Sequence, residues 1–482
     1  MRALSDTTPA SVEPRRFFGA LHNRNFRYLW FAFTAASLAQ RMDGIILGWL
    51  VLELTDSAFM VGLVGSMRFL GAMLGPLTGV IADRCDRRRL QMTSLLAMTG
   101  IVALLLSLAL MRRLDVWSLF LATTLWGMVW AIHQPAQQSM QADILSGREL
   151  VGGIAMMNTA MNLTSMLGPA LGGAILECCG PRSQTWEWSE EAMVLALNTE
   201  GYQPGRMYIA SDSGQVAAST NQGLSWFPVA FLLPEPVLRT LKAAGAAEGV
   251  QWSYAVLLLL QLVQLGNYCA IRFVQRPPHL TQTSLWQNLL AGMRYSCSDP
   301  GLWTALALAG LVNLVAFPLQ FGLLPVFARD VFSVGAAGLG LLGAALGAGS
   351  LLGSILMAYI GSVSRAGRLM LLGTLGWFAL LIVFALTPDY ELALGVLVLM
   401  GIAQTFSLAN MTVLLLGTAS SDMRGRVMGL RSLAVAPLFL GGTLAGATTA
   451  SVGAPLTTIG CAVIGLALTL WVAPWVPRRV NA

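Results

Sequence analysis

Residues 79–88 read Gly79-Val80-Ile81-Ala82-Asp83-Arg84-Cys85-Asp86-Arg87-Arg88, where the apolar run 58–82 gives way to charge before the next apolar run, 90–111. Each run is long enough for a helix that crosses a bilayer, which takes about 20 residues. Of the 482 residues in the chain, 56% are hydrophobic and 11% are charged, whereas soluble domains carry about 25% charge. The mean hydropathy is +0.67. These values exclude an ordinary soluble enzyme.

Apolar runs of this length recur along the sequence. We predict an all-α membrane protein in which twelve transmembrane helices form two six-helix bundles related by a pseudo-repeat. The segment Ser364-Arg365-Ala366-Gly367-Arg368 follows the eighth run as residues 79–88 follow the second. Tight turns on the cytoplasmic side often contain Arg, which would account for each of these segments separately. It would not account for their occurrence at the same position in the two halves of the chain. The predicted spans are 27–51, 58–82, 90–111, 115–138, 151–177, 251–273, 302–328, 335–360, 367–387, 391–416, 427–450 and 454–476.

Two longer connections divide the chain. The first is an insert between helices five and six, whose alternating pattern over 206–229 predicts a small β-containing cap outside the cytoplasm, followed by a short helix near Val237 to Ala244. The second has apolar residues at helical spacing and predicts an amphipathic helix on the inner membrane surface. The predicted division is an N-terminal tail 1–26, helices one to five 27–177, the insert 178–250, helix six 251–273, the linker 274–301, the C-terminal bundle 302–476 and a tail 477–482.

The basic residues indicate how the chain is oriented. The formal net charge is +6, and 28 of the 29 basic residues are Arg. Because they lie between apolar runs, we expect no nucleic-acid partner. With both termini in the cytoplasm, the inward segments hold 20 Arg and the short outward loops hold 3, as the positive-inside rule requires. We therefore expect a multi-pass protein of the cell membrane with cytoplasmic termini, and the excess of Arg over Lys indicates a bacterial source.

Three charged residues fall inside the predicted spans: Arg41 and Asp43 in the first, and Arg68 in the second. A charge at mid-bilayer costs at least about 2.5 to 3.5 kcal/mol, so each is a functional candidate. At the helical rise per residue, Asp43 lies about 12 Å and Arg68 about 15 Å from the outer ends of their helices. We expect a buried cluster with one excess positive charge, in which the Arg residues keep Asp43 ionised. It is either a structural ion pair or a site for coupling or substrate.

Several motifs resemble those of a known family. Residues 79–88 resemble the signature loop of the major facilitator superfamily, which implies that Gly79, Asp83, Arg84, Arg87 and Arg88 help to gate the inward side. The segment 168–173 looks like the end of the antiporter motif, through Gly168, Pro169, Gly172 and Gly173. Further stretches are similar to the branch that contains enterobactin and macrolide exporters: Asn25-Phe26-Arg27-Tyr28-Leu29-Trp30, Trp49-Leu50-Val51-Leu52-Glu53-Leu54-Thr55, Gln134-Pro135-Ala136 and Arg424-Gly425-Arg426-Val427-Met428.

The resemblance also implies where a substrate binds, because spans one, four, seven and ten line the central cavity in that family. It favours Asn313, Gln320 and Gln404 as cavity residues, with Trp126 and Trp130 as aromatic walls. The alternative for each is a contact between helices or with lipid. His133, near the inner end of span four, is expected to cap a helix or lie at the membrane interface rather than to relay protons.

These observations favour a secondary transporter that exports a hydrophobic or amphipathic small molecule, drug-like or siderophore-like, by alternating access. Proton coupling is implied by the resemblance. The sequence has no nucleotide-binding motif and no metal-ligand cluster, so we expect no enzyme activity, no metal and no cofactor beyond a coupling proton. We expect a monomer whose partners are its substrate and the bilayer. The alternatives are a transporter-shaped sensor or scaffold that binds through its insert, and a passive facilitator.

Overall fold

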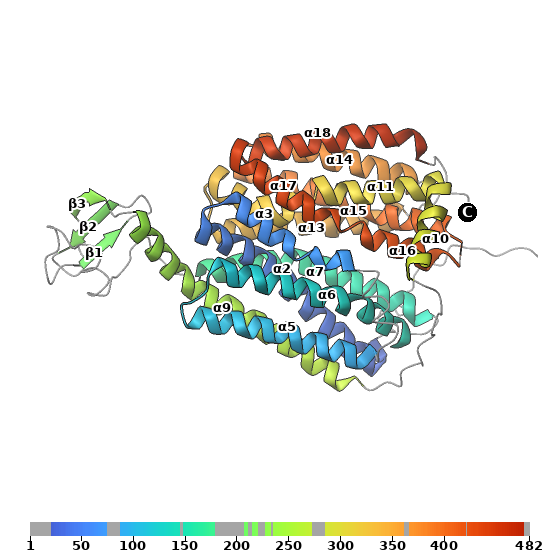
Figure 1. The fold of residues 1–482 in the computed structure, drawn as a ribbon, viewed down its shortest axis with the longest axis horizontal. Coiled ribbons are helices and arrows are strands. Elements are labelled where there is room, and N and C mark those ends of the chain that lie inside the picture. Colours follow the sequence, from blue (N-terminus) through green and yellow to red (C-terminus); the bar gives the residue numbers. More distant parts are fainter. Residues whose placement is uncertain are drawn as a thin grey trace, which may run out of the picture.

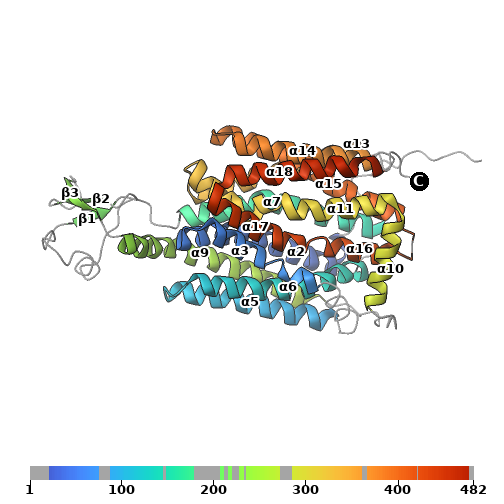
Figure 2. The same ribbon diagram turned by 45° about the horizontal axis from the view of Figure 1, so that its top comes forward.

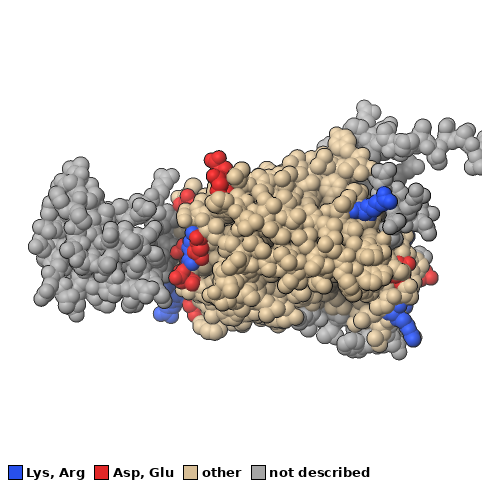
Figure 3. Space-filling model, turned by 90° about the horizontal axis from the view of Figure 1, so that it is seen from above, with Lys and Arg blue, Asp and Glu red and all other residues tan. Residues whose placement is uncertain are grey.

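Long helices make up most of the protein (Figure 1). The computed structural model describes residues 21–74, 87–144, 148–178, 207–210, 215–219, 227–232, 235–271, 285–360, 366–420 and 422–476. Within these ranges, ten helices are long and apolar enough to cross a membrane, and a shorter apolar helix covers Ala58–Ala72. Figure 3 shows one face of the molecule, on which charged side chains gather toward the two ends of the helical body and leave a broad uncharged band between them.

The helices fall into an N-terminal and a C-terminal half. The N-terminal half contains α2 (Arg24–Thr55), α3 (Ala58–Met67), the 3-10 helix η2 (Leu70–Leu74), α5 (Arg87–Leu110), α6 (Val116–Ile144), α7 (Arg148–Cys178) and α9 (Glu235–Ala270). The C-terminal half contains α10 (Leu285–Ser298), α11 (Pro300–Val315), the π-helical η3 (Leu319–Leu323), α12 (Leu324–Val326), the π-helical η4 (Phe327–Val331), α13 (Ala336–Ile360), α14 (Ala366–Leu386), α15 (Tyr390–Thr418), α16 (Arg424–Leu433), α17 (Pro437–Val452), α18 (Ala454–Val472) and η6 (Ala473–Trp475). Figure 2 shows α10 lying across one end of the other helices.

Three of the predicted continuous spans are interrupted. The second breaks after Met67, where the N–H of Phe69 donates to the carbonyl of Ser66 at 2.9 Å. The seventh breaks before Pro318 and continues as π-helical turns, because proline lacks an N–H and clashes with the preceding turn. The eleventh breaks before Pro437, which begins α17.

Small residues let the two halves approach closely. A Cβ atom added to Gly173 of α7 would lie 2.8 Å from the Cα of Gly340 in α13, and one added to Gly62 of α3 would lie 2.9 Å from the Cα of Gly446 in α17. Such contacts are typical of helices packed in a membrane. Polar groups also cross between the halves: the carboxylate of Glu177 accepts from the N–H of Ala337 at 2.7 Å. These contacts join α3 to α17 and α7 to α13.

A small sheet follows the first five long helices. Strands β1 (Met207–Ala210), β2 (Gln215–Ser219) and β3 (Phe227–Leu232) form an antiparallel sheet in the order β1-β2-β3. Figure 1 shows the sheet beyond the end of α9, away from the helical body. The helix expected near Val237 to Ala244 is not separate, since α9 is a single helix of 36 residues. The part of α9 that is apolar enough to cross a membrane begins at Gly249. The alanine-rich first half of α9 has high helix propensity, so nothing interrupts it before the apolar half.

Candidate transport site

An ion pair joins the first two long elements of the N-terminal half. Asp43 lies near the middle of α2, and Arg68 directly follows the last residue of α3. The Nη2 atom of Arg68 donates to the Oδ2 atom of Asp43. The side chains are 8% exposed for Arg68 and 24% exposed for Asp43. The break in the second span therefore places the guanidinium beside the carboxylate, inside the bundle.

An aromatic side chain of α6 also contacts the guanidinium of Arg68. Its Cζ atom lies 5.0 Å from the centre of the Trp126 ring, which is a cation–π contact. Trp130 stacks on Trp126 with ring centres 6.3 Å apart. A Cβ atom on Gly127 would lie 2.8 Å from the backbone carbonyl carbon of Arg68, so a larger residue there would displace the arginine. Of the two predicted aromatic residues, Trp126 thus lies beside the ion pair, and Trp130 contacts Trp126.

Arg41, the third charged residue of the predicted cluster, faces another neighbour. Its Cβ atom lies beside Gly168 of α7, and the like charge of Arg68 acts on its guanidinium. Within the residues that the structure describes, no carboxylate forms an ion pair with Arg41. The excess positive charge expected from the sequence therefore belongs to Arg41.

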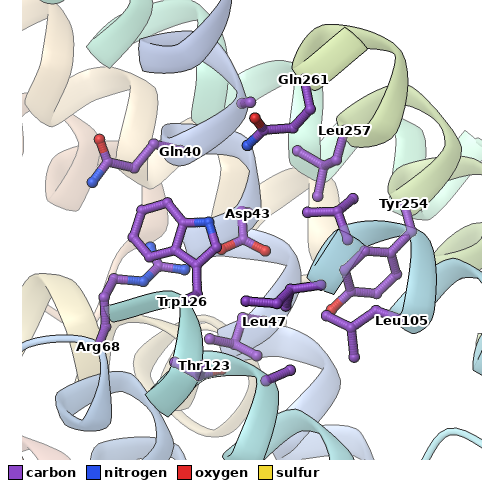
Figure 4. Close-up of a pocket in the computed structure, with 14 residues that line it drawn as sticks. Gln40, Asp43, Leu47, Arg68, Leu105, Thr123, Trp126, Tyr254, Leu257 and Gln261 are labelled. Atoms are coloured by element: carbon purple, nitrogen blue, oxygen red, sulfur yellow. The ribbon is translucent and has the colours of Figure 1, made fainter. Parts of the chain in front are cut away.

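A cavity with a volume of about 30 Å³, counted as the space open to the centres of water molecules, lies beside the carboxylate of Asp43, between α2, α5, α6 and α9 (Figure 4). Its polar lining residues are Gln40, Asp43, Arg68, Thr123, Tyr254 and Gln261, and its aromatic wall is Trp126. The sequence analysis missed the contribution of α9. The available signal was the seven-residue spacing of Tyr254 and Gln261, which puts both on one face of an otherwise apolar helix.

A second cavity, of about 20 Å³ by the same measure, shares Arg68 and Leu47 with the first. It is bounded by Gly44 and Gly48 of α2, Gly65 of α3 and Phe321 of η3, so it lies where the two halves meet. Arg68 lines both cavities, whereas Asp43 lines only the first. Arg68 therefore adjoins both a space inside the N-terminal half and a space between the halves.

The three predicted cavity amides lie elsewhere. Gln320 donates from Nε2 to the Oε1 of Gln404 at 3.2 Å, which joins η3 to α15. Asn313 donates to the carbonyl of Ala309, one turn earlier in α11, at 2.8 Å. None of the three lines the two cavities described above. Their amides bond to protein groups, as the alternative of helix contacts predicts.

The antiporter-like motif packs α7 against two neighbours at once. Gly168 and Gly172 face α2, whereas Pro169 and Gly173 face α13 of the other half. The motif therefore lies where the charged helix α2 and the C-terminal half come together.

Most of the predicted gating loop cannot be placed. Gly79, Asp83 and Arg84 lie outside the described residues. Arg87 is the first residue of α5, and Arg88 is exposed.

The expectation that His133 is an interfacial or capping residue is wrong. The side chain is 4% exposed and lies in a polar network that joins α5, α6 and α9. Its Nε2 atom lies 3.0 Å from Nε2 of Gln91, and its Nδ1 atom 3.0 Å from Oγ of Ser94. Gln91 also donates to the hydroxyl of Tyr268 at 3.1 Å. These partners satisfy a buried polar ring.

Comparison with known proteins identifies the family. The model of the transmembrane secretion effector family matches residues 16–195 and 242–480, which is most of the chain. The chain belongs to this family of the major facilitator superfamily. Proteins of this family are multi-pass membrane transporters and not enzymes. The enterobactin exporter EntS of Shigella flexneri is 30% identical over 232 residues, which cover 47% of this transporter and 54% of the exporter. EntS of Escherichia coli strain HS matches over the same shares.

The match spans about half the length of these curated relatives.

Solved structures resemble the whole fold. A bacterial homologue of the human lysosomal transporter Spinster, inward-facing and unoccupied, has a TM-score of 0.59 at 14% identity, with 97% of this transporter and 98% of that chain covered. The Escherichia coli fucose:proton symporter FucP has a TM-score of 0.58 at 12% identity, with shares of 94% and 98%. At such identities the likeness concerns the fold alone.

Proposed function

We propose that this transporter exports an amphipathic small molecule by alternating access of its two halves, in exchange for protons. The observation that carries the proposal is the ion pair of Asp43 and Arg68, which adjoins two cavities. Buried ionisable groups in membrane helices mark substrate or proton routes. The likeness to an enterobactin exporter supports export as the direction and a drug-like or siderophore-like molecule as the substrate.

Arg68 couples the two cavities in this mechanism. While it is paired, its charge stabilises the carboxylate of Asp43. When Asp43 takes up a proton, Arg68 loses its counterion and turns into the cavity beside Phe321, which it also lines. There it takes the space that a substrate would occupy. Proton and substrate thereby exclude one another through one arginine, which is the requirement for exchange.

We also propose twelve spans. Besides the ten long apolar helices, α3 with the residues after it and the Gly-rich and Asn-containing α7 would supply the other two. This count agrees with cytoplasmic termini, a location in the inner membrane of a bacterium and an insert on the outer side, because it keeps most Arg residues inside. The transporter would act as a monomer.

The test is substrate flux in proteoliposomes. A panel of toxic compounds, screened in a strain without other pumps, supplies the substrate. The expected result is accumulation against a gradient that depends on a pH difference and is lost in Asp43→Asn. Asp115→Asn is the matched control, because Asp115 lies in the loop between α5 and α6. Flux without accumulation would indicate a passive facilitator, and binding without flux would indicate a sensor or scaffold.

A further inference from the structure

The cavity beside Asp43 contains two polar atoms that the protein leaves without partners. The hydroxyl of Tyr254 and the Oε1 atom of Gln261 are buried, and neither has a hydrogen-bond partner in the described part of the chain. Tyr254 is 0% exposed and Gln261 is 6% exposed. Buried polar atoms in folded proteins almost always have a partner, which is either a protein group or an ordered water molecule.

Tyr268 provides an internal comparison. It lies two further turns along the same face of α9 and is 3% exposed, but its hydroxyl accepts from Gln91. Of Tyr254, Gln261 and Tyr268, which follow one another at seven-residue spacing on α9, only Tyr254 and Gln261 have an unpaired polar atom, and only these two line the cavity. Figure 4 shows Tyr254, Gln261 and Asp43 around the same space. The unpaired atoms therefore point to a hydrogen-bonding ligand of the cavity and not to a poorly packed helix.

We infer that this cavity is a water site through which protons reach Asp43, separate from the substrate route in the cavity beside Phe321. The inference rests on the proposed proton exchange. The cavity volume of about 30 Å³ is enough for water, because one molecule needs about 10–15 Å³ of space open to its centre. Water can donate to Gln261 and Asp43 and accept from Tyr254, and so pairs both unpaired atoms of the cavity. An apolar substrate could pair none of them.

The groups around Asp43 fit a proton-binding role. Arg68 faces it from the end of α3 and Tyr254 from α9, and Arg41 is the nearest further charge on α2. The lining residues from α5 and α6 are neutral. A hydrated proton transfers to a carboxylate oxygen of Asp43 and leaves a water molecule behind, and Arg68 then turns away. The reverse transfer to the same water returns the carboxylate to Arg68.

Hydroxyl-radical footprinting of the full-length protein in liposomes tests for this water directly, because radicals formed from bound water modify adjacent side chains. We expect Tyr254 to be modified at least about fivefold faster than Tyr268, since only Tyr254 would adjoin trapped water. The two tyrosines share a helix and a degree of burial, so each measurement contains its own control. Equal rates for the two residues would overturn the inference.

A second experiment tests whether the water serves transport. Gln261→Met and Tyr254→Phe keep the size of the side chain and remove the polar atom. Each should slow pH-driven flux by about tenfold, the effect of one lost hydrogen bond, with substrate binding unchanged. Gln264→Met is the matched control, because Gln264 is 2% exposed on the same helix but does not line the cavity.

The outcomes separate this inference from the proposed function. Normal flux in both cavity variants would overturn the inference, even if Asp43→Asn abolishes flux. Pump-like flux that survives Asp43→Asn would refute the proposed coupling, while fast labelling of Tyr254 would still establish the water site. If Gln264→Met slows flux as much as Gln261→Met, the effect belongs to the helix as a whole and the inference fails.

Discussion

Replacing Asp43 with Asn should destabilise the protein by leaving Arg68 charged and unpaired. Removing one partner of a buried ion pair costs about 3–5 kcal/mol. Two features of the structure reduce this cost. The side chain of Asp43 is 24% exposed, and Arg68 keeps its contact with Trp126 at 5.0 Å, which is worth about 0.5–2 kcal/mol. We therefore expect a loss of about 2–3 kcal/mol in the free energy of unfolding.

The double variant makes the prediction specific. Adding Arg68→Met to Asp43→Asn removes the remaining charge and fills a similar volume. Stability should return to within about 1 kcal/mol of the wild type, because neutral side chains of similar size replace buried ion pairs at little cost. Unfolding of the purified proteins in mixed detergent micelles, followed by circular dichroism, measures all four members of the cycle.

Additivity would refute this reasoning. If the double variant loses the sum of the two single losses, within about 0.5 kcal/mol, then Asp43 and Arg68 do not interact energetically. An undiminished stability of Asp43→Asn would likewise show that Arg68 does not depend on its counterion. Either result would remove the structural basis for the proposed coupling through Arg68.

Three other changes have defined outcomes. Gly127→Ala places a methyl group against the backbone of Arg68 and should cost about 1–3 kcal/mol in thermal unfolding, as overpacking does; an unchanged transition would contradict the close contact. Glu177→Ala removes the acceptor for the N–H of Ala337 at the start of α13, so spin labels on α7 and α13 should report an open population about fivefold larger, given about 1 kcal/mol for the lost contact. Hydrogen bonds from Ser118 lower the pKa of Asp115. The stability that they supply is present above the ordinary pKa and lost as the pH falls through the lowered one, so Asp115→Asn should flatten acid unfolding below pH 4.

The depth of the charged layer could be predicted from the sequence, but its internal pairing could not. Helical rise alone places Asp43 and Arg68 at similar heights in neighbouring helices. Which of two nearby arginines meets the carboxylate depends on how each helix is rotated and where it breaks. The break after Met67 turns Arg68 toward Asp43 and Trp126, whereas Arg41 packs against α7. No local pattern in the sequence encodes that break.

The partners of the buried side-chain amides could not be predicted from the sequence either. Gln320 and Gln404 lie on helices expected to line a cavity, yet they bond to each other. Tyr254 and Gln261 lie in span six, which is not among the spans that line the central cavity in that family, yet they line the cavity beside Asp43. A polar residue in an apolar helix signals that it has a partner, but not which helix supplies it.

The sequence by itself determined that this chain is a membrane protein of long helices in two halves, with a few charges at one depth. Hydropathy, helical periodicity and the distribution of Arg are local properties, and the bilayer acts on each segment separately. Only the tertiary structure decided which side chains share a cavity and that Arg68 lines two of them. Those relations depend on the rotation, breaks and close packing of helices that are distant in sequence, and a linear pattern does not specify them.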